Sequence, residues 1–218
     1  MSLSTTPATA RTDLGAAPPA LAGSRPTVST RQARLTGVAV AAGSAAWAAG
    51  LLLFGPNPDP GWGDTVYNLT SLLFQLGLVA LVTLQLRTGA VGTGRLARSA
   101  LHTEHVLLGL AILSTATWIF LRQYDDATWF LLLDAFWPLS MLGMAAIGVR
   151  IAIAGRWQGA ARFWPVVAES WAPVVVPVNA VFGNAVGGAA GALHLVVGYV
   201  ALGIILARRP ELTGARDD

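Results

Sequence analysis

The stretch TVYNLTSLLFQLGLVALVTLQL, residues 65–86, decides the fold class of this chain. It contains no Asp, Glu, Lys or Arg, and it is long enough for one helix to cross a bilayer, which takes about 20 apolar residues. The sequence therefore predicts an all-α integral membrane protein, a compact bundle of six transmembrane helices. Five other apolar stretches are about as long, and three of them contain a single acidic residue: residues 35–54, 99–121, 128–149, 163–182 and 187–207.

The composition agrees with a membrane protein and excludes several chemistries. Of the 218 residues, 54% are hydrophobic and 11% are charged, whereas a soluble domain carries about 25% charge. The chain has no Cys, which excludes disulfides and a cysteine nucleophile, and no Lys, which excludes a lysine Schiff base. A net charge of +3 is too small and dispersed to favour nucleic acid binding.

Arginine positions predict the orientation of the helices. Thirteen of the 14 Arg residues lie before the first stretch, after the last, or between the second and third and the fourth and fifth stretches. Because cytoplasmic segments retain positive charge, we expect this Arg-rich side and both termini in the cytoplasm and the protein in the cell membrane. Arg122 lies on the opposite, Arg-poor side, together with Asp59, Asp64, Asp125 and Asp126.

Three segments are expected along the chain. Residues 1–30 are rich in Ser, Thr, Ala and Pro and have no apolar run, which is typical of a disordered cytoplasmic tail. Residues 31–209 hold the transmembrane domain, and residues 210–218 form a short cytoplasmic tail.

Glycines mark one face of the last predicted helix. Gly187, Gly191, His194 and Gly198 are spaced by 4, 3 and 4 residues, so they lie on one side of a helix. Glycine faces allow helices to approach closely in a membrane. We therefore predict a buried packing face, and a protein partner or a second copy of the chain could also associate through it.

Glu169 is the leading candidate for a catalytic residue. It lies among Pro165, Pro173 and Pro177, and Pro173 has no N–H to donate to the Glu169 carbonyl, so the helix is predicted to kink or open there. A carboxyl group at membrane depth is costly and usually functional. We interpret Glu169 as a proton donor; the structural alternative is a neutral Glu that only joins helices through Tyr199 or His105.

Other polar residues are expected at two depths, counted at 1.5 Å per residue from the Arg-rich side. Glu104 and His105, roughly 10 Å deep like Glu169, are predicted to assist it in catalysis. Asp134 and His194, roughly 21–24 Å deep, are predicted to form a hydrogen-bonded pair between helices. The residues expected to line a pocket for a lipophilic molecule are Trp171, Tyr199 and Trp137.

Three functions remain open from the sequence. The first is a lipid-phase enzyme that protonates an apolar, isoprenoid-like substrate, with a cavity reaching Glu169 from the cytoplasmic side. The second is a non-catalytic membrane subunit or scaffold, and the third is a proton-linked carrier of a small molecule. The sequence argues against a haem between His105 and His194, because the two differ in depth by roughly 10 Å. No metal site and no cofactor are predicted.

Overall fold

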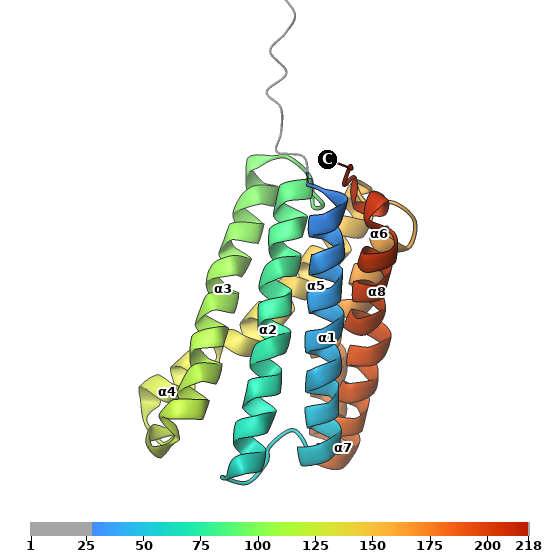
Figure 1. Cartoon of the computed structure of the whole chain (residues 1–218). Helices are drawn as coiled ribbons and strands as arrows, with labels where there is room; N and C mark the ends of the chain where they lie inside the picture. The colour runs from blue at the N-terminus through green and yellow to red at the C-terminus, as the bar shows by residue number, and fades with distance from the viewer. Residues whose placement is uncertain (1–27, 218) are drawn as a thin grey trace, which may run out of the picture.

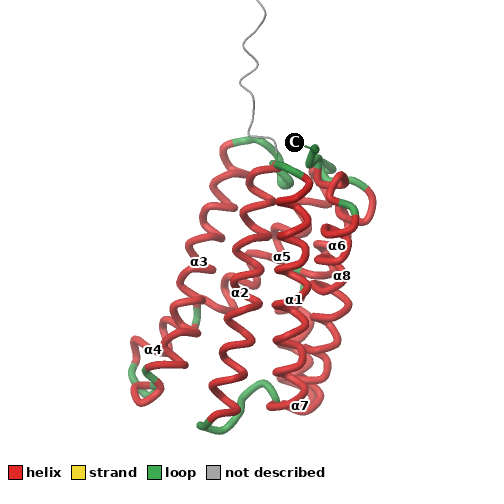
Figure 2. Tube along the Cα trace, in the orientation of Figure 1, coloured by secondary structure: helices red, strands yellow, loops and turns green. Residues whose placement is uncertain are grey.

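The computed structural model describes residues 28–217, which form helices and turns without a strand. Most helices lie side by side along one axis (Figure 1), and α4 projects from the side of the bundle (Figure 2). The helices are α1 (Thr30–Phe54), α2 (Trp62–Thr88), α3 (Arg95–Phe120), α4 (Thr128–Asp134), α5 (Phe136–Ala154), α6 (Gly159–Ala168), α7 (Trp171–Leu195) and α8 (Ala201–Arg208). Shorter turns of helix are η1 (Arg122–Tyr124), the π-helix η2 (Val196–Val200) and η3 (Pro210–Thr213).

Five helical segments of the described chain are long and apolar enough to cross a membrane, which suggests a polytopic membrane protein. Four of them coincide with the first four predicted stretches. The fifth extends over both remaining stretches, so the predicted count of six helices is not confirmed. The five segments are Thr30–Phe54, Trp62–Thr88, Arg95–Phe120, Thr128–Ala154 and Gly159–Arg208.

The fifth segment contains one non-helical residue, Gly183, in the middle of α7. Its φ of 81° and ψ of 175° belong to a region that is essentially restricted to glycine. Residues on the two sides of Gly183 contact each other: Trp171 Nε1 donates to the Gly191 carbonyl at 3.3 Å, and the Ser170 hydroxyl lies 3.1 Å from His194 Nε2. The chain therefore folds back on itself at Gly183.

The predicted opening of the helix beside Glu169 is confirmed. Helix α6 ends at Ala168 and α7 begins at Trp171, so Glu169 and Ser170 lie in the break between them. Pro173 falls in the first turn of α7, where its missing N–H costs nothing. Trp164 of α6 contacts the facing element η2: its indole N–H donates to the carbonyls of Val197 and Gly198 at 3.0 and 3.1 Å.

Glycines bring the helices into close contact. A Cβ at Gly203 of α8 would lie 2.5 Å from the carbonyl oxygen of Gly37 on α1, so the two backbones nearly touch there. On the predicted glycine face, a Cβ at Gly191 would meet Val175 at 3.3 Å, and one at Gly198 would meet the backbone of Ala168 at 2.8 Å. Residues of the same chain therefore cover this face.

Both ends of the described chain lie at the Arg-rich end of the bundle (Figure 1). The amide of Arg216 donates to the Val28 carbonyl at 3.1 Å, and the amide of Thr30 donates to the Arg216 carbonyl at 3.0 Å. Residues 210–217, predicted as a tail, thus pack against the start of α1, where Thr213 is buried. Most of the predicted N-terminal tail, residues 1–27, lies outside the described residues.

Candidate functional site

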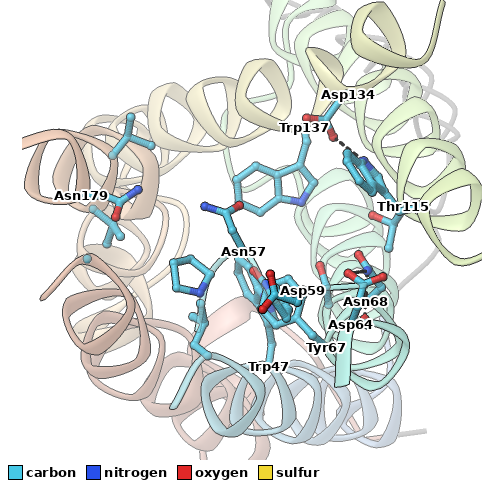
Figure 3. Close-up of a pocket in the computed structure, with 18 of the residues that line it drawn as sticks. Trp47, Asn57, Asp59, Asp64, Tyr67, Asn68, Thr115, Asp134, Trp137 and Asn179 are labelled. Carbon is cyan, nitrogen blue, oxygen red and sulfur yellow. Dashed lines mark hydrogen bonds between the residues drawn. The ribbon is translucent and has the colours of Figure 1, made fainter. Parts of the chain in front are cut away.

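A cavity of about 590 Å³ lies at the Arg-poor end of the bundle. Its walls come from α1, α2, α3, α7 and the η1, α4 and α5 region, and the Pro-rich loop of residues 55–61 contributes to its mouth. Figure 3 looks into this space, with Asn179 of α7 across from Asp64 and Asn68 of α2. We call it the aromatic cavity, because three tryptophans pack together at its wall: Trp47, Trp137 and Trp171.

The three tryptophans form one cluster from three helices. The ring centroid of Trp47 lies 5.5 Å from that of Trp137 and 5.3 Å from that of Trp171, and the latter two are 5.3 Å apart. Trp137 and Trp171, predicted from sequence as pocket residues, therefore line one cavity. Tyr199, predicted with them, does not line it, because it is fully buried with its ring 5.1 Å from Phe74.

One wall of the aromatic cavity is a polar face of α2 that the sequence analysis missed. Asp64, Asn68, Ser71 and Gln75 follow each other at spacings of 4, 3 and 4 residues and are all buried. The first three line the cavity, and Gln75 continues the same face beyond it. Asn68 Nδ2 donates to the Asp64 carboxyl at 3.0 Å, and Gln75 Nε2 donates to Thr115 Oγ1 at 2.7 Å. The spacing itself is the signal that identifies this face in the sequence.

Arg122 on the Arg-poor side is explained by an ion pair at the cavity. Its guanidinium lies 2.7 Å from the Asp64 carboxylate, and its central carbon is 5.0 Å from the centre of the Trp118 ring. This is the one ion pair between side chains in the part of the chain that the structure describes. Asp59, Asp64 and Asp134 line the cavity with Arg122, so three carboxyl groups face one guanidinium.

The predicted pair of Asp134 and His194 is wrong. Asp134 Oδ1 accepts from Ser114 Oγ at 3.1 Å and from Trp118 Nε1 at 3.2 Å, whereas His194 pairs with Ser170. Similar depth was the basis of the prediction. The fold-back at Gly183 turns His194 toward the α6–α7 break, and Asp134, at the end of α4, faces α3.

Several buried polar atoms at the aromatic cavity have no hydrogen-bond partner among the described residues. They are Trp47 Nε1, Arg122 Nε and Asn179 Oδ1. Buried polar groups are nearly always satisfied by protein, water or a bound molecule. Two donors and one acceptor are therefore enclosed in the wall of the cavity without a partner among the described residues.

The predicted catalytic residues at the inner depth lie in separate hydrogen bonds. Gln85 Nε2 donates to Glu169 Oε1 at 2.7 Å, and Ser140 Oγ donates to Glu104 Oε1 at 2.6 Å. His105 has its Nε2 3.1 Å from Thr83 Oγ1. No hydrogen bond in the described chain joins Glu169, Glu104 and His105 to one another.

A second cavity, which we call the Glu104 groove, opens at the Arg-rich end between α3 and α5. Its volume is about 680 Å³, its lining is mostly apolar, and Glu104 and Arg150 are the ionisable residues in it. Glu169 lines neither this groove nor the aromatic cavity, so the predicted cavity at Glu169 is wrong. Close packing is the reason: Glu169 is 0% exposed, and a Cβ at Gly148 would lie 2.8 Å from its Oε2.

Within residues 28–217, no group of three or more His, Cys, Asp or Glu side chains is placed to hold a metal ion. The described residues form an all-helical fold with five apolar segments of membrane-spanning length, which suggests a polytopic membrane protein with polar residues in its interior. Comparison with protein-family models, with curated proteins and with solved structures finds no match for this chain.

Proposed function

We propose that the chain crosses the cell membrane six times, with both termini in the cytoplasm. The fold-back at Gly183 supports this, because it divides the fifth apolar segment into two antiparallel parts that contact each other. Each part has the length of one crossing. The arginine distribution supports the orientation, since the Arg-rich end carries both ends of the described chain (Figure 1).

Single cysteines can test this topology, because the natural chain contains no Cys. We expect a membrane-impermeant maleimide to label Asp126→Cys and Asn184→Cys on intact cells, and Thr93→Cys only after permeabilisation. All three positions are exposed in the structure. If Gly159–Arg208 crossed without turning back, residue 184 would lie inside the bilayer and would stay unlabelled.

We further propose that the protein binds a small organic cation in the aromatic cavity. The observation that supports this most is the combination of the tryptophan cluster with an excess of carboxyl groups. The cavity volume lies in the range of about 300–1,000 Å³ that is typical of small-molecule sites. Aromatic faces attract cations, and Arg122 over Trp118 already makes such a contact here.

The charges at the cavity favour a cation over an anion. Arg122 neutralises Asp64, which leaves Asp59 and Asp134 without a cationic partner in the described chain. Both hydrogen bonds to Asp134 fall on Oδ1, so its other oxygen is available. A ligand with an apolar body and one positive charge would pack on the tryptophans and pair with this carboxylate.

Two ions of the same shape and opposite charge test the proposal. Tetraphenylphosphonium should bind the purified protein in nanodiscs saturably and quench its tryptophan fluorescence, and tetraphenylborate should not compete with it. Asp134→Asn should weaken phosphonium binding about tenfold, which corresponds to about 1.4 kcal/mol, within the range of about 1–4 kcal/mol for one charge pair at contact distance.

Asp126→Asn is the matched control, because Asp126 lies near the same end but does not line the cavity. It should leave phosphonium binding unchanged, and empty nanodiscs should give the background from partition into lipid. Equal binding of both ions, or an equal effect of the two variants, would contradict recognition of a cation in the aromatic cavity.

One observation supports the alternative function of a lipid-phase enzyme that uses Glu104 and Glu169. Glu104 lines an apolar groove, as an acid acting on an isoprenoid-like substrate would. Glu169, the predicted proton donor, is enclosed and has no cavity at its side chain. We therefore place the proposed function, binding of an organic cation, in the aromatic cavity.

A further inference from the structure

Three fully buried polar side chains lie in the half of the bundle nearer the Arg-rich end: Glu169, Gln85 of α2 and Tyr199 of η2. Each is 0% exposed, and each has an oxygen without a hydrogen-bond partner among the described residues. These atoms are Glu169 Oε2, Gln85 Oε1 and the Tyr199 hydroxyl. Unsatisfied polar atoms are few in folded proteins, so the two on Glu169 and Gln85, which already share a hydrogen bond, require a physical explanation.

Glu169 and Gln85 already share one hydrogen bond. Gln85 Nε2 donates to Glu169 Oε1 at 2.7 Å, so the amide and the carboxyl group are in direct contact. Each group has one further oxygen, and these two oxygens are the unsatisfied ones. An ionised carboxylate and an amide oxygen are both acceptors, and two acceptors cannot satisfy each other.

No cation of the described chain can balance a charge on Glu169. The ion pair of Arg122 and Asp64 lies at the opposite end of the bundle. At the Arg-rich end, Arg162 donates from Nε to the Ala152 carbonyl at 2.9 Å, and Arg150 is exposed at the Glu104 groove. A buried charge without a partner is far more costly than a buried neutral group that is hydrogen-bonded.

We propose that Glu169 is a proton-binding site and that its carboxylic acid forms a two-point pair with the Gln85 amide. Gln85 Nε2 donates to Glu169 Oε1, and the proton on Glu169 Oε2 is donated to Gln85 Oε1. One proton thus satisfies both unpaired oxygens and removes the buried charge. With the Gln85 amide turned by 180°, one proton would still be required between the two groups.

The surroundings of the pair suit a neutral acid. Gly148 of α5 provides the space for Oε2, since a Cβ there would lie 2.8 Å from it. The titratable groups on the neighbouring elements are two residues of α3, one of α7 and one of η2. Glu104 is bound to Ser140, His105 to Thr83 and His194 to Ser170, and the fourth group is the Tyr199 hydroxyl. None of these supplies a fixed positive charge. Glu169 and Gln85 do not line the aromatic cavity, so proton binding at this pair does not depend on cation binding in that cavity.

Infrared difference spectroscopy tests the proposal on the full chain in nanodiscs. A protonated carboxyl group and a carboxylate absorb at different frequencies, so the spectrum of wild type minus Glu169→Gln identifies the form that is lost. We expect the loss of one acid carbonyl band at both pH 7 and pH 8, and a shift of that band on deuteration. Glu169→Gln retains both hydrogen bonds as an amide–amide pair, so it should fold.

Two further variants identify the site and its partner. Gln85→Leu removes the acceptor for the proton, so the acid band should move to higher frequency. Glu104→Gln is the matched control and should leave the Glu169 band in place. Loss of a carboxylate band in Glu169→Gln would overturn the proton site, and an acid band that does not respond to Gln85→Leu would overturn the pairing.

Discussion

Replacing Gly203 with alanine is expected to destabilise the bundle, and replacing it with leucine should prevent folding. A Cβ at this position would lie 2.5 Å from the Gly37 carbonyl oxygen and 2.6 Å from the Ala41 amide nitrogen, both on α1. Backbone atoms cannot rotate away as a side chain can, so α1 and α8 must separate. Overpacking by a single group costs typically about 1–3 kcal/mol, a large part of a total stability of about 5–15 kcal/mol.

Gly109→Ala is the control for this substitution. Gly109 is also inside a helix, but a Cβ there would meet nothing within 4 Å. Because alanine favours helix over glycine by roughly 0.5–1 kcal/mol, this variant should be as stable as the wild type or slightly more stable. Thermal unfolding of both proteins in the same detergent measures the difference. Equal melting temperatures would show that α1 and α8 do not cross this closely.

The sequence predicts the helices themselves but not the contact between α1 and α8. Apolar runs of about 20 residues predict the membrane-length helices because a bilayer sets their length. Proline chemistry predicts the helix break at Glu169, since Pro173 lacks an N–H. Both are local properties. Helices α1 and α8 are far apart in the sequence, and their contact depends on how all the helices are arranged in the bundle.

The incorrect predictions share one physical origin. A count of 1.5 Å per residue gives the depth of a side chain but not the direction in which it points. Asp134 and His194 were placed at similar depth and yet face different helices. Glu169 and Glu104 were likewise placed at one level, but each has its own partner, Gln85 and Ser140.

The polar face of α2 could have been predicted from sequence. Asp64, Asn68, Ser71 and Gln75 repeat at helical spacing within an apolar stretch, and polar residues at membrane depth face the protein interior. Trp47 is different, because its sequence neighbours are small and apolar and give no indication of a cavity. Its role follows only from the meeting of α1 with α5 and α7.

Trp47→Ala is expected to cause the largest loss of stability among substitutions at the aromatic cavity. Trp47 is 2% exposed, stacks on Phe74 at 4.9 Å and contacts Trp137 and Trp171. Removing a buried tryptophan costs typically about 3–5 kcal/mol. In a membrane the loss is one of packing, because lipid provides no hydrophobic force that holds helices together. Phosphonium binding should weaken as well, since the cluster loses one of its three rings.

Trp62→Ala separates this effect from the general loss of a tryptophan. Trp62 is 76% exposed at the start of α2, and its main aromatic contact is the edge of Phe54 at 5.4 Å. Unfolding of the two variants by denaturant should therefore give a much smaller change for Trp62→Ala, and Trp47→Phe should restore part of the stability that Trp47→Ala loses. Similar losses for Trp47→Ala and Trp62→Ala would mean that Trp47 does not join α1 to α5 and α7, because only a buried ring between those helices makes the two substitutions differ.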